Sequence, residues 1–197
     1  MDPILQNLIK ILTQLPSLGP RSARRITLSL IKHPEMISKL ISSLTQAKNS
    51  IKKCKICNNL SQQNVCEICL DDNRDQNQIC IVENLCDLWA IERIGQFLGT
   101  YYILEESFSL ANIINKDNCD LEKQLEARIS EEPTECIIAM NPTIEGQATI
   151  HYLQSILKKY SNITITTLSL GIPMGSELDY LDNGTLTVAL NSRKEID

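Results

Sequence analysis

Aromatic side chains are scarce in this 197-residue chain, and none occurs in the first 60 residues. They make up 4% of the sequence. Binding that stacks nucleic-acid bases on aromatic rings is therefore a weak prospect for the N-terminal part. Uninterrupted apolar runs are short as well, and none approaches the ~20 residues of a membrane span. The sequence thus argues against an aromatic stacking platform near the N-terminus and against a membrane protein.

A secretory signal is also missing from the start of the sequence. The first residues, Met1-Asp2-Pro3, lack the basic region and the apolar region of such a signal. We therefore expect a cytoplasmic protein whose cysteines are reduced. Four of its eight cysteines are dispersed along the chain, and we expect these to be mostly buried thiols: Cys80, Cys86, Cys119 and Cys136.

Acidic side chains are few in the first 60 residues, where Asp2 and Glu35 stand against ten Lys and Arg residues. This part has a net charge of +8, whereas the other 137 residues have nine basic and 22 acidic side chains, which gives −13. The basic N-terminal part favours nucleic acid as a partner, and the acidic remainder of the chain favours a partner of the opposite charge. Simple solvation of both halves remains the alternative.

The other four cysteines form two C-x-x-C pairs that eight residues separate: Cys54 and Cys57, then Cys66 and Cys69. Each pair can place two thiolates on one side of a tight turn, and four thiolates suit a tetrahedral zinc ion. Two local disulfides or four unrelated thiols are the alternatives. Because cysteine would fill all four positions, we predict one structural Zn²⁺ that stabilises the fold and has no open site for substrate.

The periodicity of apolar residues divides the chain into regions. Helical spacing predicts N-terminal helices over 4–15, 21–32 and 34–44. Short apolar runs then alternate with helical segments, which predicts an α/β fold with a largely parallel sheet covered on both faces. The expected strands are 79–82, 101–104, 136–140 and 163–168, the expected helices 86–95, 120–131 and 146–159, and short helical pieces lie near 176–181 and 185–191. The predicted regions are 1–53 (helices), 54–75 (zinc module), 76–168 (sheet) and 169–197 (tail, with oligomer contacts).

The segment 15–23 joins two predicted helices through a turn that contains Gly19. The N–H groups at the start of the second helix can bind a phosphate. Arg21 and Arg25 lie four residues apart on one face of that helix, with Arg24 beside them and Lys10 on the preceding helix. This pattern resembles a helix–hairpin–helix, which binds the DNA backbone without reading sequence. An ordinary helix–helix turn with surface arginines is the alternative.

Acidic residues follow the predicted strands, at the edge where parallel sheets bind ligands. Glu83 and Asp87 follow the first strand, and Glu145 follows Asn141-Pro142-Thr143 after the third. The layout is similar to a Toprim domain, in which a strand-terminal Glu and a D-x-D loop bind magnesium for phosphoryl transfer. Here Asn141 and Thr143 occupy the D-x-D positions and bring no charge. The acids could therefore bind a basic protein partner, bind Mg²⁺ weakly, or face water.

Together these motifs, in this order, resemble the RecR family of bacterial recombination mediators. The tail 170–178 fits as well, and the resemblance covers nearly the whole chain. It implies a non-enzymatic DNA-binding protein of the bacterial cytoplasm, associated with the nucleoid. It also implies homodimers or tetramers that form a ring around DNA, and RecO-like and RecF-like partners for loading the recombinase at single-stranded gaps. A metal-dependent nuclease, primase or topoisomerase on the same fold is the rival, and a zinc-ribbon interaction module without a DNA role is a third possibility.

Three positions depart from the family pattern. Ser17 stands where the hairpin of the family usually has the first glycine of G-x-G. Gln147 stands where the family usually has Glu. The loop 105–116 lacks the usual G-H-x-S-P core and keeps only Ser109 of it. We therefore expect the approach of the hairpin to phosphate, the charge of the acidic edge and the contacts of this loop to differ from those of relatives.

Overall fold

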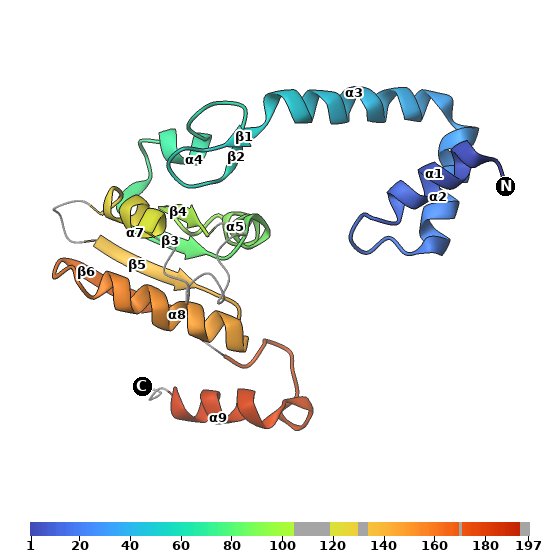
Figure 1. Cartoon of the computed structure of the whole chain (residues 1–197). Helices are drawn as coiled ribbons and strands as arrows, with labels where there is room; N and C mark the ends of the chain where they lie inside the picture. The colour runs from blue at the N-terminus through green and yellow to red at the C-terminus, as the bar shows by residue number, and fades with distance from the viewer. Residues whose placement is uncertain (105–118, 130–133, 170, 194–197) are drawn as a thin grey trace. The chain divides into compact units, whose positions relative to one another are not determined.

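The computed structural model describes residues 1–104, 119–129, 134–169 and 171–193. The chain divides into two compact units, Met1–Lys52 (unit 1) and Lys53–Asp197 (unit 2). Figure 1 shows the elements of both units. No helix in the described ranges is both long enough and apolar enough to span a membrane.

Unit 1 consists of three helices that each begin with proline: α1 (Pro3–Leu12), α2 (Pro20–Lys32) and α3 (Pro34–Ser50). Proline suits the first helical position because its missing N–H has no intrahelical partner there. The Asp2 carboxylate caps α1 by accepting the N–H of Ile4 at 2.8 Å. All residues of unit 1 are described, and Ala23 and Thr27 alone are buried. The unit therefore has a very small core of its own.

The four-cysteine module opens unit 2, and its short elements are β1 (Lys52–Lys53), which begins at the last residue of unit 1, β2 (Leu60–Ser61) and α4 (Glu67–Leu70). β1 and β2 pair as a two-stranded sheet. The module leads directly into the main sheet.

The main sheet has four parallel strands in the order β4-β3-β5-β6. The strands are β3 (Asp75–Val82), β4 (Gly99–Ile103), β5 (Thr134–Ala139) and β6 (Ile163–Thr167), and the connecting helices are α5 (Leu85–Glu92), α7 (Cys119–Glu126) and α8 (Ile144–Leu157). This arrangement confirms the predicted α/β fold class. The expected helix 120–131 ends earlier, at Glu126, because the N–H groups of Arg128 and Ile129 also bond to the carbonyls three residues back, those of Leu125 and Glu126, which tightens the last turn.

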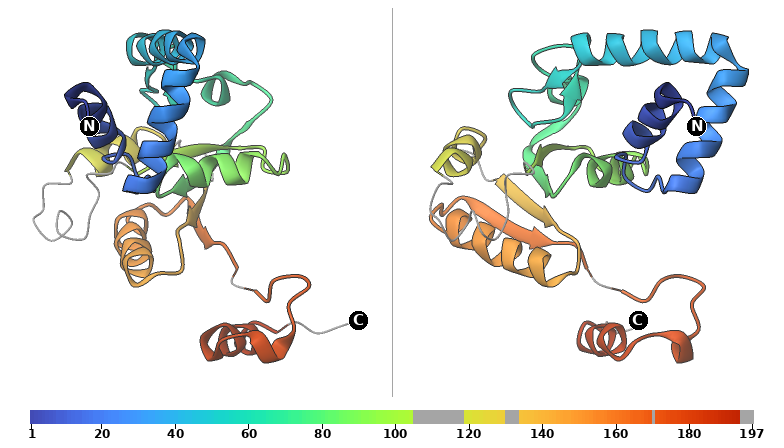
Figure 2. Two further views of the ribbon diagram at one scale, coloured as in Figure 1. Left: turned by 90° about the vertical axis from the view of Figure 1, so that its right-hand side faces the viewer. Right: turned by 45° about the vertical axis from the view of Figure 1, so that its right-hand side comes forward.

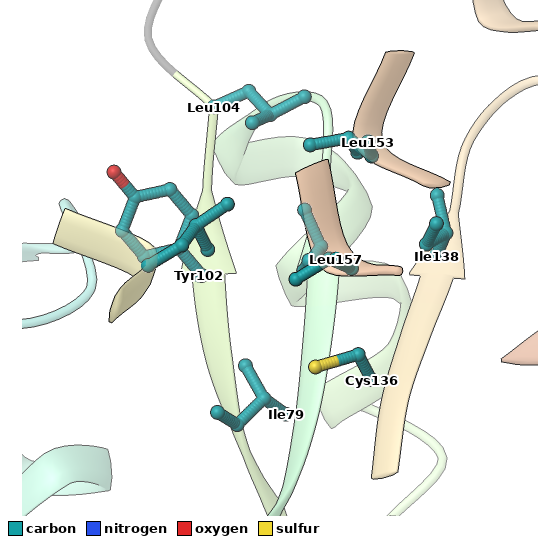
Figure 3. Close-up of a cluster of buried hydrophobic side chains, with 9 residues drawn as sticks. Ile79, Tyr102, Leu104, Cys136, Ile138, Leu153 and Leu157 are labelled. Atoms are coloured by element: carbon teal, nitrogen blue, oxygen red, sulfur yellow. The ribbon is translucent and has the colours of Figure 1, made fainter. Parts of the chain in front are cut away.

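Alternation along β3 produces two cores, one on each face of the sheet. Ile79 and Ile81 point to the face that α7 and α8 cover, where Tyr102, Leu153 and Leu157 pack (Figure 3). The second core lies on the opposite face under α5, and its buried members are Cys80, Val82, Leu88, Tyr101, Ile103 and Ala139. The sheet is therefore covered on both faces, as its continuously apolar strands predict.

The C-terminal tail contains the 3₁₀ turn η1 (Leu178–Tyr180) and the helix α9 (Asn183–Asn191), seen at the red end of the chain in Figure 2. Asp182 caps α9 by accepting the N–H of Thr185 at 2.9 Å. No residue of η1 or α9 is buried. The tail therefore exposes apolar side chains, among them Met174, Leu178 and Tyr180.

Candidate functional site

The four cysteines of the module lie together, and their Sγ atoms are all within 4.8 Å of one another. Cys54, Cys57 and Cys66 are buried and Cys69 is half-buried. The Sγ atoms of Cys57 and Cys66 are 3.5 Å apart. Tetrahedral zinc with Zn–S bonds of about 2.3 Å needs sulfur atoms about 3.8 Å apart, so these cysteines fit a zinc ion.

The thiols of this cluster perturb one another. Hydrogen bonds from Cys57 and Cys69 lower the pKa of Cys66, which is the direction that a metal ligand requires. The hydrogen bond to Cys66 raises the pKa of the Cys57 thiol in turn. Metal binding requires all four cysteines as thiolates, and a divalent cation would compensate the charge of these three buried groups and one half-buried group.

Backbone geometry brings the first pair of cysteines together. The carbonyl of Cys54 accepts the N–H of Asn58 at 3.0 Å, and the carbonyl of Asn59 accepts the N–H of Cys54 at 2.6 Å. Asn58 has φ of +64°, a left-handed conformation that asparagine tolerates better than most residues. The N–H groups of Ile56 and Cys66 donate to the Sγ of Cys54 at 3.4 and 3.3 Å. Such N–H···S bonds stabilise a thiolate, as a metal ligand requires.

The module also bonds to the edge of the main sheet. The Asn58 side-chain amide donates to the carbonyl of Ile103 at 2.9 Å, and the N–H of Ile103 donates to the carbonyl of Cys57 at 3.0 Å. Ile103 ends the edge strand β4, so the module occupies backbone groups that would otherwise be open. The sequence analysis missed this contact, because nothing in the polar stretch 58–64 identifies a strand as its partner.

The predicted DNA-contacting arginines lie on the first two turns of α2. Arg21, Arg24 and Arg25 are all exposed, and Lys10 is exposed in the last turn of α1. No described carboxylate is within ion-pair distance of these arginines. Gly19 caps α2 without a side-chain hydrogen bond, which leaves N–H groups of the first turn accessible.

The acids at the carboxyl edge of the sheet are less closely grouped. The Glu83 carboxylate accepts the side-chain amide of Asn141 at 2.9 Å, which brings the ends of β3 and β5 together. Asp87 lies in the first turn of α5, where burial first and Glu83 second raise its pKa. Glu145 is exposed in the first turn of α8. Within the described ranges, the four cysteines are the one group of three or more His, Cys, Asp or Glu side chains close enough to hold a metal.

Family comparisons agree with this arrangement over nearly the whole chain. Models described as RecR helix-hairpin-helix, RecR four-cysteine zinc finger, Toprim domain and RecR C-terminal match residues 5–48, 51–71, 77–169 and 171–194. The chain is 42% identical over 192 residues to "Recombination protein RecR" of Bartonella bacilliformis, which covers 97% of this chain and 95% of that protein. It belongs to the RecR family. A protein of the same name from Rickettsia massiliae is 41% identical over 194 residues, with 98% and 96% covered.

The structure describes two of the three departures from the RecR pattern, Ser17 and Gln147. Ser17 has φ of +64°, the left-handed conformation that glycine adopts without cost. An added Cβ on Gly19 would meet nothing within 4 Å, so the second hairpin glycine leaves open space for an approaching ligand. Gln147 is exposed on α8. The divergent loop 105–116 lies outside the described residues.

The dispersed cysteines only partly follow the expectation that they are buried. Cys80 and Cys136 are buried in the two cores, and burial raises the pKa of Cys80 to about 12 and that of Cys136 to about 11. Cys86 is exposed at the start of α5, whereas Leu88 is the buried residue of that helix. The side chain of Cys119 lies outside the described residues. The seven described cysteines are free, so none of them forms a disulfide.

Proposed function

We propose that this RecR-family chain is a non-enzymatic, DNA-binding mediator of recombination and repair. Membership in the family and its helix-hairpin-helix segment support a role in DNA recombination and repair. The main support for DNA binding by this chain is a group of three exposed arginines on α2, which have no carboxylate partners among the described residues. Unpaired guanidinium groups are available for phosphate, whereas paired ones are not.

The expected contact is with the DNA backbone. A helix N-terminus with accessible N–H groups favours an anion, and arginines on the same turns add charge around it. Unit 1 has no aromatic residue for base stacking. Such a surface holds DNA through phosphates and reads no base sequence.

The acids at the carboxyl edge of the sheet are the proposed docking surface for a basic protein partner, a RecO-like or RecF-like protein. Glu83, Asp87 and Glu145 lie in two neighbouring strand-to-helix connections, which the hydrogen bond between Asn141 and Glu83 joins. Complementary charge there would speed encounter more than it strengthens final binding. With DNA held by unit 1, such a partner would allow recombinase loading at single-stranded gaps.

Assembly into a homodimer or tetramer ring is part of the proposal. A single 22.2 kDa chain is too small to encircle a duplex about 20 Å across. Apolar side chains are exposed on α3, at Met36, Leu40, Ile41 and Leu44, and others are exposed in the tail. Contiguous exposed apolar surface is typical of protein–protein contacts, and symmetric self-association can bury it.

The rival enzyme would need a magnesium centre at the same edge. The Asn141 amide donates a hydrogen bond to Glu83, where a second carboxylate would instead share a cation with it. Weak Mg²⁺ binding by Glu83, Asp87 or Glu145 is compatible with a non-catalytic role. Magnesium-dependent cleavage or relaxation of DNA that Glu83→Gln abolishes would establish the rival.

A salt titration tests DNA binding directly. Arg21→Gln with Arg25→Gln should weaken binding to unrelated DNA sequences equally. It should also reduce the slope of log affinity against log salt by about 1 for each phosphate that the variant no longer binds. The matched control removes two exposed lysines of α3, Lys39→Gln with Lys48→Gln. An arginine double variant with the wild-type slope would contradict this location for the DNA site.

A further inference from the structure

A cleft of about 410 Å³ lies between the cysteine module, β3 and the end of α7, all within unit 2. The module contributes Lys55 and Ile56, and β3 contributes Gln76 and Asn77. Gln124, Ala127 and Arg128 come from α7 and the turn that follows it. The three segments are coloured teal, green and yellow in Figure 1. The volume is in the range of small-molecule binding sites.

The charge of this cleft is opposite to that of its surroundings. Lys55 and Arg128 both line it, although unit 2 has 22 acidic against 11 basic side chains. No carboxylate in the described part of the chain is within ion-pair distance of either cation. Asp75 begins the same strand, but its Oδ1 accepts the backbone N–H of Asn77 at 2.9 Å. Two unpaired cations at one cleft favour an anionic ligand.

Arg128 is held in place by a neutral partner. Its Nη2 donates to the Thr100 hydroxyl at 2.7 Å, and that hydroxyl donates to the carbonyl of Gln78 at 3.2 Å. The guanidinium is half-buried and oriented, while its other N–H groups remain for a ligand. A planar fork of donors of this kind suits the oxygen atoms of a phosphate group.

The rest of the lining suits a nucleobase. Three amide side chains border the cleft, and amides can both donate and accept, as base edges do. The Gln124 Oε1 accepts the Tyr102 hydroxyl at 2.5 Å, so its amide hydrogens remain available as donors. Ile56 and Ala127 add an apolar wall for the flat face of a base.

We infer that this cleft binds a nucleoside phosphate, with Lys55 and Arg128 on the phosphate and the amides on the base. The ligand is one unpaired nucleotide of a DNA strand, because a base within a duplex is stacked and paired and does not reach such a cleft. This inference rests on the proposed DNA-binding function: a strand bound by unit 1 would present nucleotides to unit 2 at high effective concentration. The cleft would then give the protein a preference for gapped or single-stranded DNA over duplex.

The test uses the full-length protein, with Lys55→Gln, Arg128→Gln and the double variant. Lys123→Gln is the matched control, because it removes an exposed cation of α7 that does not line the cleft. Fluorescence anisotropy measures binding to a single-stranded oligonucleotide and to a fully paired duplex of the same length. Calorimetry measures binding of free dAMP, and a glutamate-rich peptide serves as a second anionic probe.

We expect the double variant to bind the single strand about tenfold more weakly or worse, with duplex binding unchanged. Lys123→Gln should leave both affinities at the wild-type level. Binding of dAMP that the double variant abolishes would also support the site, and would identify a free nucleotide as a second source of the ligand. Zinc content and the unfolding temperature are measured for every variant. Lys55→Gln alone supplies the result if Arg128→Gln does not fold, because the Lys55 side chain is exposed.

Three outcomes would overturn the inference. In the first, wild-type protein binds DNA and the cleft variants match Lys123→Gln, which leaves the proposed DNA-binding function intact. In the second, neither dAMP nor any DNA binds wild-type protein, and both the inference and the proposed function fail. In the third, the acidic peptide binds in a Lys55-dependent manner and the nucleotide does not, so that the cleft is a peptide site.

Discussion

The two units of this chain use positive charge in opposite ways. In unit 1 the arginines of α2 are exposed and have no acidic partner among the described residues. In unit 2, Arg74 is only 13% exposed and bonds to both carboxylate oxygens of Glu92, to Asp71 and to the carbonyl of Gly99. Its hydrogen bond to Glu92 raises its pKa. Arg74 is therefore committed to holding β3, β4 and α5 together, whereas the cations of α2 are available to a ligand.

The units also differ in what stabilises them. Unit 1 buries two side chains, whereas unit 2 has two apolar cores and a metal-ligand cluster. Unit 2 therefore provides the stable scaffold, and unit 1 can keep a charged surface for binding. Lys55 and Arg128 are exceptions to the difference in charge between the units. They belong to unit 2, and yet they have no ion-pair partner among the described residues. This exception is why the cleft between them indicates a ligand.

Removal of zinc should have the largest effect on stability, and this effect should be confined to unit 2. Cys66→Ser, or treatment with a chelator, should abolish the metal site, whose binding free energy in zinc-finger peptides is about 10 kcal/mol or more. Hydrogen exchange at the amide of Ile103 should then accelerate strongly, while exchange in α2 stays at its wild-type rate. Cys86→Ser, at an exposed cysteine outside the cluster, is the control. Unchanged protection of Ile103 in zinc-free protein would show that the module does not stabilise the sheet.

Loss of the Arg74 side chain should have the next largest effect. Arg74→Ala leaves the half-buried Glu92 carboxylate without its partner, and we expect a loss of about 2–3 kcal/mol in the free energy of unfolding. Denaturant unfolding measures this loss. The control is Arg93→Ala, the next residue along the chain from Glu92, whose side chain is exposed. Equal stability of the two variants would mean that the cations of unit 2 are as free as those of unit 1.

Ser17→Gly should stabilise unit 1. The left-handed conformation of Ser17 costs about 1–2 kcal/mol for an ordinary residue, and the greater freedom of glycine in the unfolded chain offsets part of the gain. We expect a net gain of about 0.5 kcal/mol, measured as slower hydrogen exchange in α1 and α2. Ser22→Gly, inside α2, should cost about as much. Destabilisation by Ser17→Gly would indicate that the serine hydroxyl makes a contact that matters more than its backbone strain.

The smallest effect concerns Asp87 and depends on pH. Burial raises the pKa of Asp87 above its ordinary value, so the folded protein binds this proton more tightly than the unfolded chain does. The stability from this group is therefore greatest at low pH and is lost as pH rises through the folded pKa. Asp87→Asn should gain stability relative to wild type as pH rises from the acidic range to neutrality, measured as the difference in unfolding temperature. The exposed Asp72→Asn serves as the control, and a difference that does not change with pH would contradict the assignment.

Local patterns were sufficient to predict the strands of the main sheet and the helices of the chain, but not the short elements β1, β2 and α4 of the cysteine module. Continuously apolar runs identified the four strands of the main sheet, and the knuckle spacing identified the cysteines that the structure brings together. The start of β3 was missed because Asp75, Gln76 and Asn77 are polar, and such residues indicate turns when read alone.

The contacts between elements could not be predicted from one sequence. The hydrogen bond of Asn58 to Ile103 spans 45 residues, and the cleft joins Lys55 to Arg128 across the module, the sheet and α7. No periodicity or spacing in the sequence identifies either pair of residues as a contact. Only the folded sheet brings these residues together, so the candidate nucleotide site became visible in the structure alone.

The bond between Asn58 and Ile103 also bears on the order in which the molecule assembles. The two knuckles can close around a metal through short loops, whereas every pairing of the parallel sheet requires long loops to close. The metal-bound knuckle would thus be complete before β4 has a neighbour. During refolding, the carbonyl of Cys57 and the side-chain amide of Asn58 would already be in place to bond to Ile103 at the end of that strand. The module would thus act as a template for the edge of the sheet.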